Sequence, residues 1–402
     1  EPAWRLNLMS ATLAAGAAGL TALAVRKTGA CTQSPTRNLQ LAVCVAPICT
    51  ALGLGLAPLF WSQALITEVY APAAFFTALV TYLALGTGSA WMLGLVWGVG
   101  IGAHPTLLFM APVVAWRVWE SGGTRWCRLI QVALPTLLGW GIMYGPVLLA
   151  RGDVPSPWGD VSTFEGWWAL VSARMYHGYL FGLPLPAWPQ RVLAWAGLLA
   201  RQFTPVGATL AVLGWTYLWR ERRALALASA IAFGAFSLYA IGYNTRDSLV
   251  YLVVVLPLIA LWLGIGLLRA ANWLTRRVRW GAGLLLLLPV LQALLFWGQV
   301  NLSDDRMATE WARQVLQPAP PQAIVLTDQD GDTFALWYVH HVLGVRPDVT
   351  IVDVDLWAQE PYRRMMSDVL QVEPGENGLS PQEAAHRTGR PVVVMTSDQQ
   401  DE

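Results

Sequence analysis

The stretch FWSQALITEVYAP, residues 60–72, joins two long apolar runs and holds one carboxylate, Glu68, with no Lys or Arg. Glu68 is the only acidic residue between Glu1 and Glu120. A carboxylate at the edge of a bilayer is costly unless it faces a polar cavity or a charged partner. The stretch therefore predicts two membrane segments with a functional carboxylate between them; an ordinary interfacial loop residue is the alternative.

The composition is that of an integral membrane protein. Of 402 residues, 55% are hydrophobic and only 13% are charged, against about 25% charged in an ordinary soluble domain. Residues 1–300 carry a net charge of +11 and residues 301–402 a net charge of −10. This asymmetry predicts a mainly α, polytopic membrane domain over 1–300 and a small extracytoplasmic α/β domain over 301–402. No nucleic-acid signature is present.

Apolar runs that approach the roughly 20 residues of a membrane helix are expected to span. One further run, 91–119, could cross once or form two short helices around His104-Pro105. Short loops rich in Lys and Arg stay cytoplasmic, and all basic loops share one side only if 91–119 crosses an even number of times. We therefore expect a hairpin there and about ten membrane helices in all. The other expected spans are 5–25, 39–58, 69–86, 128–149, 192–219, 224–242, 249–268 and 281–300.

Polar residues of interest then collect on the extracytoplasmic side. The segment from about 150 to 190 is rich in Trp, Tyr and Gly and predicts a helix over 163–176, capped by Ser162 or Thr163. Tyr176 at its end could face a site, or the whole segment could be a membrane-surface anchor.

Beyond Asn301 the pattern becomes α/β. Strands are predicted at 323–328, 348–353 and 391–396 and a helix at 332–344, which indicates a partly parallel sheet. The DQDGDT loop, 328–333, fails as a calcium loop because its glycine is fourth and not sixth. Acidic capping, with Asp332 at the helix start, is favoured over a metal-binding DxD.

Common catalytic motifs are absent from the sequence. It contains no P-loop, no HExxH, no GxSxG and no GxGxxG after a strand. The four cysteines, Cys31, Cys44, Cys49 and Cys127, show no CxxC spacing and predict neither a disulfide nor a zinc site.

Several motifs occur in one order along the chain: WRLNLMSATLAA (4–15), LFWSQALITEVYAPAAFFTAL (59–79), GIGAHPTLLFMAP (100–112), GYNTRDSLVYLVVVLPLIALWLGIGL (242–267) and DQDGDTFALWYVHHVLGVRPDVTIVDVDL (328–356). Together they resemble a polytopic bacterial membrane family, known as a domain of unknown function, related to transmembrane protein O-mannosyltransferases of the GT-C class. The resemblance implies an enzyme of the bacterial inner membrane. It would move a sugar from a polyprenyl phosphate to an acceptor protein or glycan on the extracytoplasmic face.

The resemblance also implies an essential acidic residue in the first extracytoplasmic loop, within a DSGE-type motif followed by an HPPG-type segment. Neither motif occurs in this sequence, which begins at the family's WR-NL-SA motif. We therefore expect an N-terminally truncated fragment, inactive as it stands, with its general base upstream of Glu1.

The remaining polar residues suit sugar transfer from a lipid phosphate. That reaction needs a base on the acceptor hydroxyl and cations or donors on the leaving phosphate, and an Arg fork suits phosphate oxygens well. No cofactor is predicted with certainty, and a divalent metal remains open. Arg246 and Asp247 could instead simply cap a helix. The catalytic candidates are Glu68 and His104; the substrate-binding candidates are Arg5, Asn7, Tyr70, Tyr176, Asn244, Arg246 and Asp247.

Two other classes of protein fit part of the pattern. A transporter or flippase of lipid-linked glycans would move its substrate without forming a glycosyl product. A non-catalytic assembly factor would use the acidic C-terminal part to dock partners.

Overall fold

The computed structural model describes residues 2–28, 37–122, 124–149, 161–278, 280–373 and 379–395. The expectations for Cys31 and for residues 150–160 lie outside these ranges. The chain forms two compact units. The first comprises residues 1–144 and 176–301, and the second comprises residues 145–175 and 302–402.

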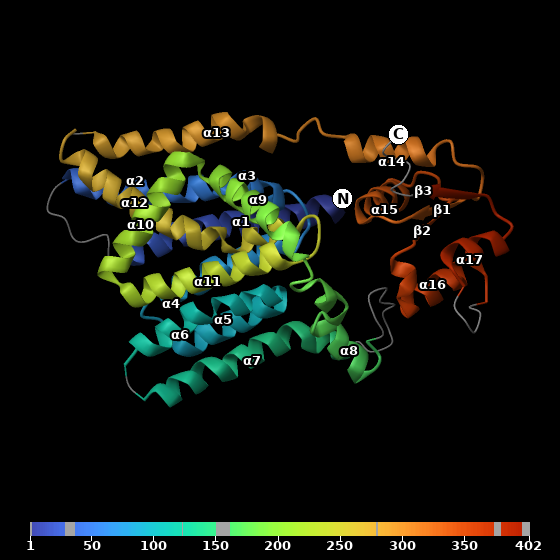
Figure 1. Ribbon diagram of the computed structural model, residues 1–402, viewed down its shortest axis with the longest axis horizontal. Coiled ribbons are helices and arrows are strands. Elements are labelled where there is room, and N and C mark those ends of the chain that lie inside the picture. Colours follow the sequence, from blue (N-terminus) through green and yellow to red (C-terminus); the bar gives the residue numbers. More distant parts are fainter. Residues whose placement is uncertain are drawn as a thin grey trace. The chain divides into compact units, whose positions relative to one another are not determined.

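The first unit is built from helices that lie alongside one another (Figure 1). Its elements are α1 (Pro2–Lys27), α2 (Arg37–Gly55), α3 (Pro58–Ala64), α4 (Tyr70–Ala84), α5 (Ala90–Ala103), η1 (Pro105–Met110), α6 (Ala111–Glu120), most of α7 (Arg125–Leu149), η2 (Arg174–Tyr179), η3 (Leu185–Ala187), α9 (Trp188–Gln202), α10 (Thr204–Glu221), α11 (Arg223–Gly242), η4 (Ser248–Val255), α12 (Leu256–Thr275), η5 (Gly281–Leu286) and α13 (Leu287–Val300).

Within the described residues, five helical segments are long and apolar enough to cross a membrane, or up to seven if each of two bent pairs is one span. The ten expected spans are not reached on this criterion. The apolar helices α4 and α5 have 15 and 14 residues, or about 22 Å each, and a hydrocarbon core is about 30 Å thick.

The run from 91 to 119 forms a hairpin, as expected. α5 ends at His104, η1 makes the turn from Pro105, and α6 leads back. Ser89 before α5 and Ser121 after α6 line the same pocket, so both arms begin and end at one end of the unit.

The described basic groups near the C-terminal ends of α1, α6, α10 and α12 and at the start of α7 gather at one end of the unit, as expected for the basic loops. Lys27 lies over the Tyr82 ring at the end of α4, and Arg117 and Arg128 share a pocket with the neighbouring Leu83. Arg222 pairs with Glu120 of α6, at 3.5 Å. The C-terminal half of α12 joins them through Arg269, whose guanidinium lies over the Tyr217 ring of α10.

Two expected straight spans are broken. The expected span 192–219 bends by 96° between α9 and α10, and at the end of the expected span 39–58 the chain bends by 68° between α2 and α3. Pro58 and Pro205 stand in the first turn of α3 and of α10, where the missing proline N–H costs no helical hydrogen bond. Apolar periodicity does not reveal such a bend, and the expected span 192–219 holds only if this bent pair crosses the membrane as one broken span.

Two buried glutamines connect these breaks. The Gln292 Nε2 of α13 donates to the Gly53 carbonyl, 2.9 Å, and to the Gln202 carbonyl, 2.7 Å. The Gln202 Oε1 accepts a hydrogen bond from the backbone N–H of Leu59 at the start of α3, 3.0 Å. Backbone groups exposed by a break must find partners inside protein when no water reaches them, and the two amides provide these partners.

Replacing Gln292 with leucine should therefore destabilise the first unit. The Gly53 and Gln202 carbonyls would lose a buried donor, at a cost of about 1–3 kcal/mol. Thermal unfolding in detergent measures the loss as a lower midpoint. Gln299→Leu, on the exposed face of the same helix, is the matched control and should leave the midpoint unchanged or slightly higher; equal effects of the two variants would contradict this role.

Helix α12 forms the centre of the unit and packs against α10, α2 and α1. Its contact with α10 depends on glycine. A Cβ on Gly214 would lie 1.9 Å from the Trp262 carbonyl oxygen, and one on Gly266 would lie 2.0 Å from the Leu210 carbonyl oxygen. Neither position has room for a side chain, so the two helix backbones are in direct contact.

Gly214→Ala should force α10 away from α12 and destabilise the protein by about 1–3 kcal/mol, the usual cost of overpacking. Gly234→Ala in α11 adds a Cβ that meets nothing within 4 Å, and it should be neutral or stabilising because alanine favours the helix. Thermal unfolding of the two variants side by side tests this; a stable Gly214→Ala protein would overturn the close contact.

The second unit has a parallel three-stranded sheet with the order β2-β1-β3. In register, Ile324 pairs with both Thr350 and Val392. The sheet is fully parallel, where the sequence indicated a partly parallel one. Its elements are α8 (Phe164–Val171), α14 (Met307–Leu316), β1 (Ile324–Thr327), α15 (Asp330–Trp337), a π-helical turn (Tyr338–Val342), β2 (Thr350–Asp353), η7 (Leu356–Ala358), α16 (Glu360–Leu370), α17 (Pro381–Arg387) and β3 (Val392–Met395).

Local chemistry explains several boundaries in this unit. The Thr163 hydroxyl caps α8 by accepting from the Gly166 N–H, 3.1 Å. The helix predicted from Asp332 begins earlier, with Gln329 at its cap position, so Asp332 lies in the first turn and is not the cap. An acidic residue there is still favourable because it faces the positive end of the helix dipole.

Candidate functional site

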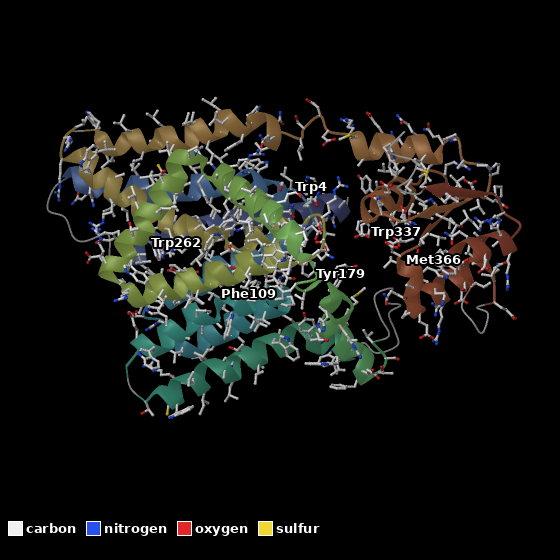
Figure 2. The ribbon with its side chains drawn as sticks, in the orientation of Figure 1. Trp4, Phe109, Tyr179, Trp262, Trp337 and Met366 are labelled. Carbon is white, nitrogen blue, oxygen red and sulfur yellow. The ribbon has the colours of Figure 1, made fainter. Side chains whose placement is uncertain are left out.

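A cluster of aromatic rings occupies the end of the first unit opposite the basic groups, and Tyr251 of η4 lies at its centre. Its ring centroid is 5.0 Å from that of Tyr239, 5.3 Å from Tyr243, 5.6 Å from Tyr70 and 5.8 Å from His104. These five residues, the aromatic cluster, come from α4, the α5–η1 turn, α11 and η4. Figure 2 labels two rings at its edges, Phe109 and Tyr179, which pack against Tyr239 and Tyr243.

His104 is a buried member of this cluster and has a structural role. Its Nδ1 accepts from the backbone N–H of Thr106, 3.2 Å, and lies 2.6 Å from the Thr106 hydroxyl. The ring thus caps η1, directly after the turn. Because Nδ1 accepts, the neutral tautomer carries its proton on Nε2. The Nε2 N–H is then the hydrogen-bond donor of the His104 ring, and this ring packs between those of Tyr70 and Tyr251.

Two carboxylates lie at the outer side of the cluster. Glu68 and Asp247 are both exposed, and both act electrostatically on the Tyr70 hydroxyl. Glu68 sits in the loop between α3 and α4, next to Thr67, whose hydroxyl donates to Asn7 Oδ1 of α1, 2.5 Å. That bond ties the Glu68 loop to the first turns of α1.

Arg191 of α9, which was not among the candidates from the sequence, holds the Asn244–Asp247 loop in place. Its two terminal nitrogens each donate to the Thr245 carbonyl, both at 3.0 Å, and Nη1 also donates to the Ser248 hydroxyl. The Asn244 N–H donates to the Tyr179 carbonyl, 2.9 Å. The loop therefore has a defined path between α9 and η2.

Tyr243, just before this loop, connects it to the aromatic cluster. Burial raises the pKa of Tyr243, and the neighbouring Tyr176, Tyr179 and Asp247 raise it further, against a lowering by Tyr251. Tyr176 and Asp247 are thus placed beside the same ring. Tyr243 itself is buried, while Tyr176 is 42% exposed.

The structure brings together seven of the nine candidate residues: Asn7, Glu68, Tyr70, His104, Tyr176, Asn244 and Asp247. The other two, Arg5 and Arg246, are exposed. Arg5 precedes Asn7 by two residues on a helix, so the two side chains point to different faces.

Tyr239, Tyr243 and Tyr251 were also missed from the sequence. A signal existed, since Tyr239 and Tyr243 are four residues apart and therefore share one helix face directly before the Asn244–Asp247 loop. No comparable signal marked Arg191.

Among the side chains that the structure describes, no three His, Cys, Asp or Glu groups converge into a site for a metal ion.

Two protein-family models match the chain. The N-terminal domain of protein O-mannosyl-transferase TMEM260 matches residues 1–122, and TMEM260-associated domain 2 matches residues 308–401. The chain is related to the protein O-mannosyltransferase TMEM260. The first match includes the Glu68 loop and the α5–α6 hairpin, and the TMEM260-associated domain covers most of the α/β unit. No curated protein and no solved structure matches the chain.

Arg191→Lys should loosen the Asn244–Asp247 loop, because an ammonium group cannot reproduce the two-pronged contact with Thr245. Limited proteolysis with trypsin, which cuts after Arg246, measures this directly: cleavage should become several-fold faster in lipid nanodiscs. Arg201→Lys, an exposed position on the same helix, is the control and should leave the rate unchanged. Equal rates in all three proteins would show that Arg191 does not hold the loop.

Proposed function

We propose that this chain is a membrane glycosyltransferase of the GT-C class. It would transfer a sugar from a polyprenyl-phosphate donor to a hydroxyl of an acceptor protein or glycan. The relation to a protein O-mannosyltransferase supports the reaction type, and the long apolar helices support a lipid-linked donor. The observation that carries the proposal is the gathering of two exposed carboxylates and a polar loop around the aromatic cluster at one end of these helices.

Each group has a place in the reaction. The acceptor oxygen forms a bond to the anomeric carbon of the sugar, the bond from that carbon to the phosphate oxygen breaks, and the acceptor proton passes to a carboxylate base, with Glu68 as a second carboxylate that orients the acceptor hydroxyl. A positioned base of this kind contributes about 10²–10⁴-fold to rate. Arg246, in the Asn244–Asp247 loop, would hold the phosphate that leaves, where a guanidinium fork matches the oxygens.

The sugar would lie against the aromatic cluster. An aromatic ring presents an apolar face to the C–H side of a sugar, and a tyrosine hydroxyl adds a polar edge. Asp247 and Asn244 would accept and donate hydrogen bonds to sugar hydroxyls at the rim. His104, neutral and buried, would orient Tyr70 and Tyr251 from below and not touch the phosphate.

The sidedness follows from charge. The basic end carries Lys27, Arg117, Arg128, Arg222 and Arg269, and short basic loops remain in the cytoplasm. The aromatic cluster at the opposite end would then face the extracytoplasmic side, together with the acceptor. Exposed rings beside it, those of Tyr176, Tyr179 and Phe181, would contact the polyprenyl tail.

Glu68→Gln in the full-length protein tests this function. We expect transfer of sugar from a polyprenyl-phosphate donor to an acceptor peptide to fall about 10²–10⁴-fold, with an unchanged thermal midpoint because Glu68 is exposed. Glu221→Gln, an exposed carboxylate at the basic end, should retain full transfer. Full activity of Glu68→Gln would remove Glu68 from the site, and movement of lipid-linked sugar without any glycosyl product would favour a flippase.

A further inference from the structure

A pocket lies at the basic end of the first unit, away from the aromatic cluster. Residues of α5, α6 and α7 line it, and the ≈ 280 Å³ of space between them includes open solvent at its mouth. α4 runs from Tyr70 in the aromatic cluster to Leu83 in this pocket, which separates the two by about 20 Å. The proposed transfer reaction therefore uses none of the pocket's residues.

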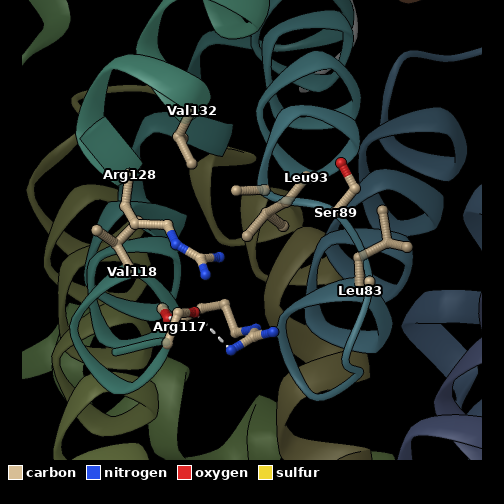
Figure 3. Close-up of a pocket in the computed structure, with 10 residues that line it drawn as sticks. Leu83, Ser89, Leu93, Arg117, Val118, Arg128 and Val132 are labelled. Carbon is tan, nitrogen blue, oxygen red and sulfur yellow. Dashed lines mark hydrogen bonds between the residues drawn. The ribbon is translucent and has the colours of Figure 1, made fainter. Parts of the chain in front are cut away.

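Two guanidinium groups point into this pocket. Figure 3 shows Arg117 of α6 and Arg128 of α7 extending from neighbouring helices toward the same space, across from Ser89 and Leu93. Both side chains are half-buried. Arg117 Nη1 donates to the Ser121 hydroxyl, 2.6 Å. Like charges brought together in this way repel each other unless an anion lies between them.

The pocket supplies no such anion. No Asp or Glu is among the residues that line it, and the nearby Glu120, three residues after Arg117, pairs with Arg222 at 3.5 Å. A third cation adjoins the turn between α4 and α5, since a Cβ on Gly86 would lie 2.7 Å from Lys27 Nζ. The start of α5 adds its own positive end, with Ser89 at the cap position and no side-chain cap bond.

Other cations of this end are arranged differently. Arg223 lies over the Trp219 ring at 5.0 Å, Arg269 over Tyr217 at 3.3 Å, and Arg277 over Trp273 at 4.4 Å. Stacking on a ring is a common way to hold a cation at a membrane surface without an anion. In contrast to these stacked cations, Arg117 and Arg128 both line the same pocket.

We propose that this pocket binds a phosphate group, held by the Arg117 and Arg128 forks and the N-terminus of α5. Guanidinium forks and free N–H groups at a helix start are the donors that phosphate oxygens prefer. The apolar lining of Leu83, Leu93, Val118 and Val132 favours the phosphate of a lipid headgroup, and anionic lipids are concentrated at the cytoplasmic leaflet. A free phosphate shares the same chemistry, and the experiment separates the two.

The test compares phosphatidic acid with diacylglycerol of the same acyl chains, added to the detergent-solubilised full-length protein during thermal unfolding. Phosphatidic acid should raise the midpoint and diacylglycerol should not, because a ligand that binds only the folded state stabilises it. Arg128→Gln should weaken the apparent affinity about tenfold, as expected for losing a charge-assisted fork. Arg223→Gln, at the same end but stacked on Trp219, should bind as the wild type does.

Three further results decide the proposal. Arg128→Lys, which keeps the charge and the fold but loses the fork, should bind with intermediate affinity. An equal, Arg128-dependent shift with inorganic phosphate would identify the phosphate alone as the ligand, whereas no shift with inorganic phosphate would identify a lipid headgroup. The proposal is overturned if phosphatidic acid gives no shift, or if it shifts Arg128→Gln and Arg223→Gln equally.

Discussion

The structure of the first unit depends on satisfying the backbone groups that two broken apolar helices expose. In a bilayer every such group needs a partner inside the protein, and the breaks at α2–α3 and α9–α10 each release several. The side chains of Gln202 and Gln292 provide donors and an acceptor where the breaks meet. Since both amides are buried, the bends are fixed features of the fold.

These bends determine which residues meet at the end of the unit that holds the aromatic cluster. The α2–α3 break turns the chain so that Trp61 of α3 can donate to the Val300 carbonyl at the end of α13, 3.0 Å, and the Glu68 loop follows directly. The α9–α10 break orients α9 so that Arg191 reaches the Asn244–Asp247 loop. Close helix contact at Gly214 and Gly266 then brings α10 against α12, which continues from η4 and its Tyr251.

The two ends of the unit differ in how their charged groups are arranged. One carries exposed carboxylates beside the partly buried aromatic cluster, and the other carries cations stacked on aromatic rings or directed into a pocket. The proposed orientation in the membrane rests on the basic end, because short loops rich in Lys and Arg stay cytoplasmic. This orientation also leaves the carboxylates at an end where they can act on a hydroxyl acceptor.

The sequence by itself determined the membrane class, most helix positions, the hairpin at His104-Pro105 and the three strands, because these follow from local apolar periodicity, proline placement and charge. It also named seven residues that the structure gathers near the aromatic cluster. Only the tertiary structure decided the 96° bend, the Gln202–Gln292 link and the roles of Arg191 and Tyr251. These depend on hydrogen bonds between residues up to 239 positions apart, and no local pattern specifies which buried amide will meet which broken helix.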